Sequence, residues 1–122
     1  MSRKKDFSSP DMPLTPAVFY ILLSLATKER HGYGIMKQVD LDSKGKVRLG
    51  PGTLYGAIKR LVDEKLVAEK ESLSDERRRY YKLTDKGMRI FKTELTRFDE
   101  AVSLAKKRKL LESISLSTVV FI

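Results

Sequence analysis

The stretch that decides the fold is residues 50–64, which read GPGTLYGAIKRLVDE. Gly50-Pro51-Gly52 marks a break between the preceding segment and a new helix. Pro51 suits the first turn of that helix, where no amide donor is needed. Four apolar residues then fall on one side of that helix at about 100° per residue: Leu54, Ile58, Leu61 and Val62. The sequence therefore predicts a helix from about Thr53 to Glu64 with one side buried in a core.

The opposite side of this helix is suited to contact a phosphate backbone or base edges. It carries Thr53, Gly56, Lys59, Arg60 and Asp63, with Tyr55 on the boundary. Gly52 and Thr53 also offer free N–H donors at the helix start, where phosphate groups bind readily. Two interpretations of Tyr55 remain open: a contact to the DNA backbone, or a core residue with a hydrated hydroxyl.

After this helix the pattern changes its period. Residues 66–71 and 77–83 have the character of two short strands around a polar turn at 72–76. Tyr81 shares a strand face with Leu83 and is expected in the core. The run Arg77-Arg78-Arg79 favours phosphate contact over a solvated hairpin in which these arginines pair with nearby acids.

Upstream, two further helices are predicted. Residues 1–12 show no periodicity and are interpreted as a flexible basic arm. Thr15 and Pro16 are expected to begin a first helix that ends near Lys28.

A turn at 28–32 should lead into a short second helix, whose apolar side carries Ile35, Met36 and Val39. Gly34, near its start, is expected to let the backbone pass close to a neighbour. Residues 42–46 are interpreted as a basic loop, and residues 47–49 as a brief strand.

The last helix is predicted from Asp85 to about Leu111, capped by Thr84-Asp85. Its apolar residues alternate steps of three and four: Met88, Phe91, Leu95, Phe98, Val102 and Ala105. A helix about 40 Å long at 1.5 Å per residue is too long for the rest of the chain to cover, so a second copy is the simplest partner. The same side chains could also line a ligand pocket. Residues 113–122 form a tail of unknown role.

Composition limits the classes of function. The 25 Lys and Arg against 16 Asp and Glu give a net charge of +9, which suggests a polyanionic partner such as nucleic acid. Without Cys and with His31 as the single histidine, thiolate metal sites and Cys nucleophiles are excluded, and an enzyme is disfavoured. The longest apolar run, residues 17–23, is far shorter than the ~20 residues of a membrane span, so a cytoplasmic protein is expected.

The order of these elements predicts a mostly α protein with a small β-hairpin. Residues 13–84 would form a winged helix-turn-helix domain that binds DNA, and residues 85–112 a C-terminal dimerisation helix. In such a fold the third helix enters the major groove and the hairpin lies along the phosphates.

Several ordered motifs resemble the PadR family of bacterial transcriptional regulators. They are Gly52-Thr53-Leu54-Tyr55, residues 61–67 (LVDEKLV) and residues 77–87 (RRRYYKLTDKG), and His31-Gly32-Tyr33-Gly34 matches the start of that family's second helix. The likeness covers roughly Leu14 to Leu111. It implies a winged-helix repressor that dimerises through its C-terminal helix and often responds to a small aromatic or drug-like compound.

The candidate residues follow from these patterns. Those expected to bind DNA are Tyr33, Pro51, Gly52, Thr53, Tyr55, Gly56, Lys59, Arg60, Arg77, Arg78 and Lys82. Those expected at a dimer contact are Met88, Phe91, Leu95, Phe98, Val102 and Ala105. The expected partners are an inverted-repeat DNA duplex and a second copy, with a small aromatic effector as a further candidate and no cofactor, metal or catalytic residue. The alternative is a winged-helix adaptor whose basic face binds an acidic protein.

Overall fold

The computed structural model describes residues 13–71 and 79–112, so the predicted arm at 1–12, the turn at 72–76 and the tail at 113–122 lie outside the described residues. The elements in chain order are α1 (Pro16–Ala26), β1 (Arg30–His31), α2 (Gly32–Asp42), α3 (Pro51–Asp63), β2 (Val67–Glu71), β3 (Arg79–Leu83) and α4 (Asp85–Lys107). This order confirms a mostly helical winged-helix fold with a long final helix. The first helix ends at Ala26, slightly before the predicted Lys28.

Side-chain caps begin three of the helices. The Thr15 hydroxyl accepts a hydrogen bond from the Val18 N–H at 3.2 Å, and Thr84 accepts one from Gly87 at 2.9 Å, as the sequence predicts. His31 caps α2, because its Nδ1 accepts from the Gly34 N–H at 3.1 Å. Each cap satisfies an N–H that has no partner inside its own helix.

The sheet differs from the predicted hairpin by one strand. Its order is β1-β3-β2, and both pairings are antiparallel. The segment 30–31, expected to be part of a turn, pairs with residues 80–81 on the open edge of β3. The brief strand predicted at residues 47–49 is wrong, because the structure has no strand there. That loop is held by Ser43, whose Oγ accepts from the Val47 N–H at 2.9 Å.

One core joins α1, α2, α3, the sheet and the start of α4. Its buried side chains include Ile21, Leu22, Ile35, Val39, Leu54, Ile58, Leu61, Leu66, Val67, Tyr81 and Phe91. The predicted buried side of α3 and the core position of Tyr81 are thereby confirmed. Gly87 lets α4 begin against this core, since a Cβ there would collide with the Leu66 carbonyl oxygen.

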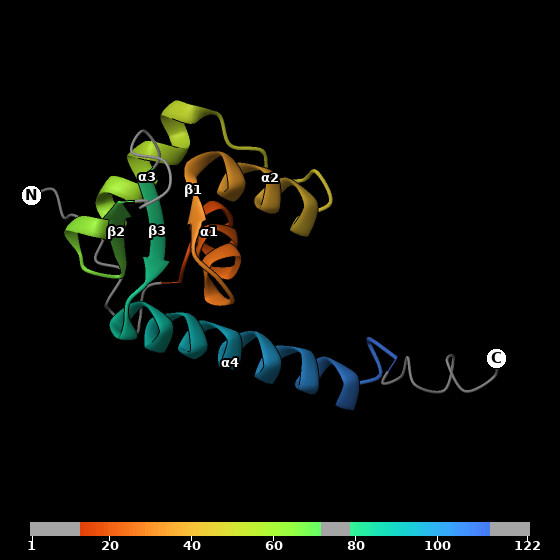
Figure 1. The fold of residues 1–122 in the computed structure, drawn as a ribbon. Helices are drawn as coiled ribbons and strands as arrows, with labels where there is room; N and C mark the ends of the chain where they lie inside the picture. The colour runs from red at the N-terminus through yellow and green to blue at the C-terminus, as the bar shows by residue number, and fades with distance from the viewer. Residues whose placement is uncertain (1–12, 72–78, 113–122) are drawn as a thin grey trace, which may run out of the picture.

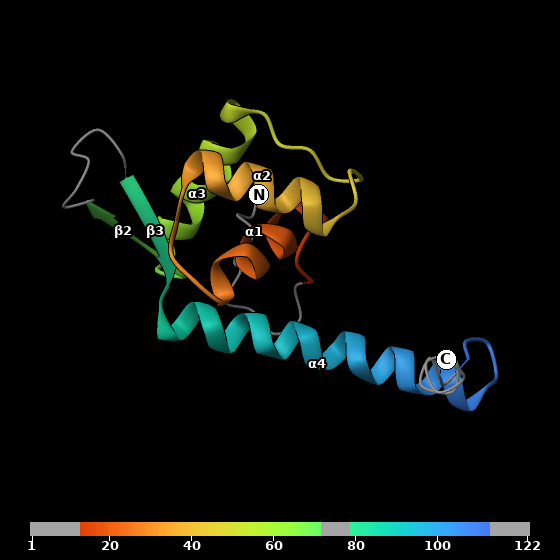
Figure 2. The same ribbon diagram turned by 45° about the vertical axis from the view of Figure 1, so that its right-hand side comes forward.

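Helix α4 lies along one end of the molecule, and α3 runs from the opposite end towards the start of α4 (Figures 1 and 2). There Lys86 donates a hydrogen bond to the Glu64 carbonyl at 3.0 Å. The first half of α4 packs on α1, where the Phe91 ring lies 5.2 Å from the Phe19 ring. Its second half runs past the other elements towards the C-terminus (Figure 1). It ends at Lys107 rather than near Leu111, because Lys109 adopts a left-handed backbone conformation with φ of 61°. None of the described helices has the length and apolar character that crossing a bilayer requires.

Candidate nucleic-acid interface

The outward face of α3 carries the predicted DNA-binding side chains together. All seven predicted residues on this helix are exposed: Pro51, Gly52, Thr53, Tyr55, Gly56, Lys59 and Arg60. The other side is fixed in the core by Leu54, Ile58 and Leu61. Because burial of these three sets the rotation of the helix, the seven residues face outward as a group.

The start of α3 has no side-chain cap. Gly50 is the N-cap residue, and its carbonyl accepts the first helical hydrogen bond from Leu54 at 2.9 Å. A Cβ added at Gly52 or Gly56 would meet nothing within 4 Å. The helix start therefore offers backbone N–H donors and an open surface, which together suit a phosphate group.

The positive charge of Lys59 is partly held by an acid on its own helix. Its Nζ lies 3.4 Å from Asp63 Oδ2, and both side chains are well exposed, at 77% and 63%. Pairs of this kind contribute little stability in water, so a phosphate can replace Asp63 at small cost. The Asp63 carboxylate thus accepts a hydrogen bond from the predicted contact residue Lys59.

The wing presents a second basic element next to α3. Lys82 is exposed on β3, while Tyr81 points into the core. Arg79 donates a hydrogen bond to Glu69 at 2.9 Å across the hairpin, which is the neighbouring-acid pairing weighed for the arginine run. Arg77 and Arg78 lie outside the described residues.

The beginning of α2 adds an aromatic cluster. Tyr33 is 61% exposed, and its ring stacks with that of His31 at a centroid distance of 6.4 Å. Lys37 Nζ lies 5.5 Å from the centre of the Tyr33 ring, and Tyr80 meets His31 edge-on at 5.6 Å. Sequence reasoning treated His31 as a turn residue and missed both its capping role and this cluster, although its place before an apolar helix pattern was a usable signal.

Tyr55 combines features of both interpretations that the sequence left open. The side chain is 45% exposed on the outer face of α3, yet its hydroxyl end packs against Gly32. A Cβ at Gly32 would collide with that hydroxyl, whereas one at Gly34 would have its nearest neighbour at 3.5 Å. The close backbone approach predicted at Gly34 is therefore at Gly32, and it ties α3 to the start of α2.

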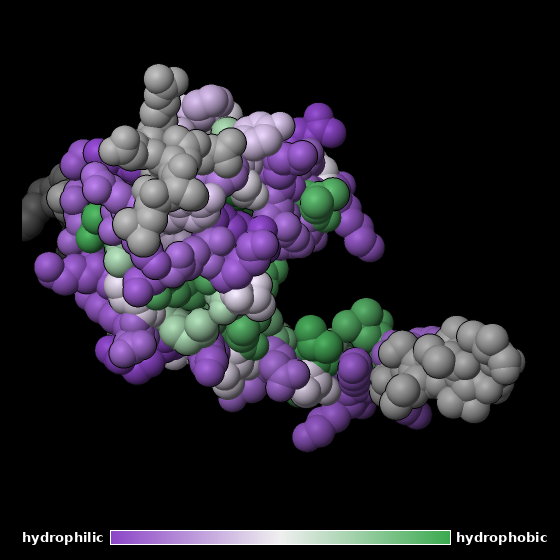
Figure 3. All heavy atoms as spheres, viewed as in Figure 1, coloured by the Kyte–Doolittle hydropathy of each residue, from purple (hydrophilic) through white to green (hydrophobic). Residues whose placement is uncertain are grey.

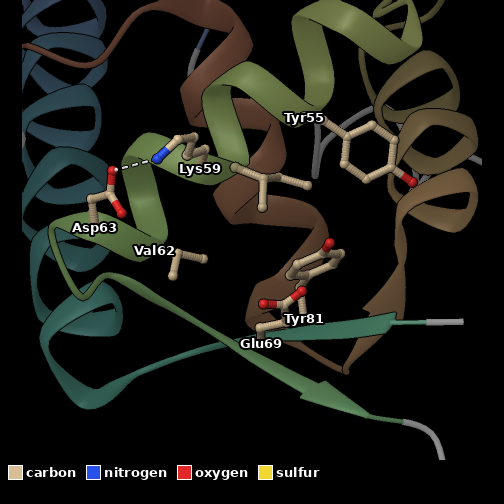
Figure 4. Close-up of a pocket in the computed structure, with 7 residues that line it drawn as sticks. Tyr55, Lys59, Val62, Asp63, Glu69 and Tyr81 are labelled. Atoms are coloured by element: carbon tan, nitrogen blue, oxygen red, sulfur yellow. Dashed lines mark hydrogen bonds and ion pairs between the residues drawn. The ribbon is translucent and has the colours of Figure 1, made fainter.

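A cavity of about 290 Å³ lies between α3 and the strands β2 and β3 (Figure 4). It is lined by Tyr55, Ile58, Lys59, Val62, Asp63, Glu69 and Tyr81. Burial raises the pKa of Tyr81, and the nearby charge of Glu69 raises this pKa further, while Arg79 opposes the shift. The cavity thus shares Tyr55 and Lys59 with the candidate interface.

The predicted dimer residues on α4 divide into two groups. Phe91 is only 2% exposed and packs inside the chain, so it is placed in the core of one subunit and not on an outward face. Leu95, Phe98 and Val102 are 38–47% exposed, and Met88 and Ala105 are half-buried. Apolar side chains gather along the part of α4 that extends past the other elements (Figure 3).

The described residues contain no group of three or more His, Cys, Asp or Glu side chains placed to hold a metal ion. What the fold does bring together is α3 and the aromatic cluster at the start of α2, through the contact of Tyr55 with Gly32. Lys82 lies on the opposite face of β3 from Tyr81, which lines the cavity with α3.

Comparison with known proteins shows which family this chain resembles. The model of the transcriptional regulator PadR-like family matches residues 21–93, which is more than half of the chain. No curated protein matches the sequence.

Solved structures show the same architecture. A PadR family transcription regulator from Clostridium difficile R20291 shares 23% identity, with a TM-score of 0.64 over 76% of this chain and 97% of that one. A transcriptional regulator from Clostridium thermocellum shares 23% identity, with a TM-score of 0.62 over 74% and 89%. PcaV from Streptomyces coelicolor shares 18%, with a TM-score of 0.64 over 88% and 69%. At these identities the likeness supports a common winged-helix fold, and with the family match over residues 21–93 the chain belongs to the PadR-like family of transcriptional regulators.

Proposed function

We propose that this protein binds double-stranded DNA at specific sequences, with α3 in the major groove and the β2–β3 wing along the phosphates. The observation that carries this proposal is the outward face of α3, where all seven predicted residues are exposed together. Thr53 can donate to a base or a phosphate, and Gly56 permits a close approach. Lys59 and Arg60 supply charge one helical turn further on.

A homodimer would give this surface its selectivity. Leu95, Phe98 and Val102 are 38–47% exposed and form an apolar stripe along α4. A second copy packed on this stripe would remove it from water, as coiled-coil contacts do. Two-fold symmetry then predicts an inverted-repeat operator whose half-sites lie about one helical turn apart, ~34–36 Å.

The regulatory outcome that we propose is repression relieved by a small molecule. Two solved structures of similar fold support this direction: the adhesin competence repressor AdcR of Streptococcus pyogenes is named as a repressor, and PcaV was solved in complex with its natural ligand. An effector bound near α4 would change the angle between the two DNA-reading lobes. A cytoplasmic location follows from a DNA target.

The test begins with selection of bound duplexes from a random-sequence DNA pool by the full-length protein. We expect an enriched inverted repeat. Affinity for that duplex is then measured by fluorescence anisotropy over a range of salt concentrations. Lys59→Ala and Arg78→Ala should each weaken binding and reduce the slope of log affinity against log salt by about 1, because each removes one phosphate contact.

Lys92→Ala is the matched control, since Lys92 is an exposed lysine on α4, a helix outside the proposed contact surface. It should leave affinity and salt slope unchanged. A pool with no enriched sequence would favour an adaptor that binds an acidic protein. Unchanged binding by both Lys59→Ala and Arg78→Ala would show that α3 and the wing are not the contact surface.

A further inference from the structure

The cavity between α3 and the sheet is lined by side chains whose arrangement DNA binding does not explain. Ile58 and Val62 line it from the helix, while Glu69 and Tyr81 line it from the strands (Figure 4). At about 290 Å³ it holds a small organic molecule and is too small for a nucleic-acid strand. Its wall therefore combines the apolar side chains of Ile58 and Val62 with polar and charged groups from both the helix and the strands.

The polar groups of this cavity favour a cation over an anion. Two of its lining residues are carboxylates, Asp63 and Glu69, against the single ammonium of Lys59. Tyr81 is 5% exposed, and within the described residues its hydroxyl takes part in no hydrogen bond. The rings of Tyr55 and Tyr81 also line the cavity, and the face of a tyrosine ring attracts organic ammonium ions.

Each carboxylate of the cavity also holds one cation of the candidate DNA surface. Asp63 pairs with Lys59 at 3.4 Å, and Glu69 pairs with Arg79 at 2.9 Å. Both cations are exposed, with side-chain values of 77% for Lys59 and 59% for Arg79. Glu69 lies beside Tyr81, whereas Asp63 is turned towards Lys59 on the other side of Val62 (Figure 4). A positive group bound at Glu69 would therefore compete with Arg79 and release it towards phosphate.

We propose that this cavity binds a small organic ammonium ion, with its apolar part against Ile58 and Val62 and its charged nitrogen at Glu69. Binding frees Arg79 for the DNA backbone, so the ligand and DNA strengthen each other's binding. By linkage, DNA raises the affinity for the ligand by the same factor. The DNA half of this proposal rests on the proposed function, and the ligand half does not.

The site itself is tested without DNA, with benzylammonium as the probe and benzoate as a probe of similar shape and opposite charge. Two-dimensional amide NMR of the full-length protein should show saturable benzylammonium shifts at residues of α3, β2 and β3 that line the cavity. Benzoate should leave these signals in place. Glu69→Gln should weaken benzylammonium binding several-fold, and Val62→Phe should abolish it by filling the cavity.

Two results would overturn the site. One is equal shifts with benzylammonium and benzoate, and the other is no cavity shifts with benzylammonium at millimolar concentration. Glu100→Gln, at an exposed glutamate on α4, is the control for the general loss of a negative charge. Should Val62→Phe fail to fold, the comparison of Glu69→Gln with Glu100→Gln still decides the matter.

The coupling is tested by operator affinity with and without benzylammonium chloride, with sodium chloride replaced to hold ionic strength constant. We expect affinity to rise about 5-fold, at the lower end of typical coupling between sites. Glu69→Gln should bind DNA more tightly without ligand and should respond to the ligand less than the wild type does. A fall in wild-type affinity, or an equal response of Glu69→Gln, would overturn the coupling. Benzylammonium binding without any DNA binding would overturn the proposed function and the coupling while supporting the site.

Discussion

The buried carboxylate of Glu94, on α4, accepts a hydrogen bond from the backbone N–H of Leu14 at 3.1 Å, although the two residues are 80 positions apart. Glu94 is 5% exposed, and its other oxygen lies 3.6 Å from Arg97. This contact fixes the entry of the chain into α1 against the middle of α4. It therefore sets how the winged-helix lobe is attached to the helix proposed to form the dimer.

Replacement of Glu94 by Ala should destabilise the protein. The Leu14 N–H would lose its charged acceptor, and hydrogen bonds to charged groups contribute about 1.5–3 kcal/mol. Glu94→Gln should lose less, since its amide oxygen can still accept. Urea unfolding at one fixed chain concentration measures both, with Glu100→Ala as an exposed control on the same helix. Equal stability of Glu94→Ala and Glu100→Ala would show that the contact contributes nothing.

Two helical glycines should respond to alanine in opposite directions. A Cβ at Gly87 would collide with the Leu66 backbone carbonyl, which cannot move aside, so Gly87→Ala should lower the unfolding free energy. Gly56 has open space around its Cβ position, so Gly56→Ala should raise helix stability by about 0.5–1 kcal/mol. Thermal unfolding of the two variants gives the comparison. A stabilised Gly87→Ala would contradict the packing of α4 on the Leu66 backbone.

Gly56→Ala has a second expected effect, on DNA. A methyl group on the outer face of α3 holds the helix away from base edges, so operator affinity should fall even though the protein is more stable. Anisotropy measured on the same preparations separates the two effects. Undiminished affinity would place Gly56 outside the contact surface.

The exposed stripe on α4 predicts the assembly state. Leu95→Glu combined with Phe98→Glu puts charge on the stripe, which should yield a folded monomer with weak operator affinity. Sedimentation velocity reports the mass, and circular dichroism reports the fold. Thr93→Glu is the matched control, because Thr93 is exposed and lies on the opposite side of the helix. A double variant that stays dimeric would move the dimer contact elsewhere.

The raised pKa of Tyr81 predicts that the folded protein loses stability at alkaline pH. Burial and the Glu69 charge raise its pKa above 10.0, so the folded protein keeps Tyr81 neutral where the unfolded chain has begun to ionise it. Its stabilising contribution is complete below the unfolded pKa and is lost as the pH rises through the folded pKa. Unfolding measured from neutral to strongly alkaline pH should show this loss, and Tyr81→Phe should reduce it. An identical pH dependence for both proteins would contradict the burial of this phenol.

Much of this structure can be predicted from local sequence patterns. The period of Leu54, Ile58 and Leu61 predicts α3 and its outer face, since a helix places residues three and four apart on one side. Thr15 and Thr84 cap their helices as predicted because a cap depends only on residues close in sequence.

The same reasoning assigned Phe91 to an outward dimer contact. Spacing shows that Phe91 shares a stripe with Phe98, but it does not show how far α1 extends along that stripe. The neighbouring helix covers Phe91 and leaves Phe98 47% exposed. The strand predicted at residues 47–49 is wrong for a related reason. An extended segment becomes a strand only where the edge of another strand is free to pair with it, and local sequence does not show this.

The sequence by itself determined the order of the four helices and the hairpin, the buried side of α3 and the membership of the family, because each depends on residues close together along the chain. Only the tertiary structure decided that residues 30–31 complete the sheet, that Glu94 holds Leu14, and that α3 lines one cavity with Glu69 and Tyr81. Such pairings join segments far apart in sequence, and they form only when burial of the shared core brings those segments within hydrogen-bonding distance.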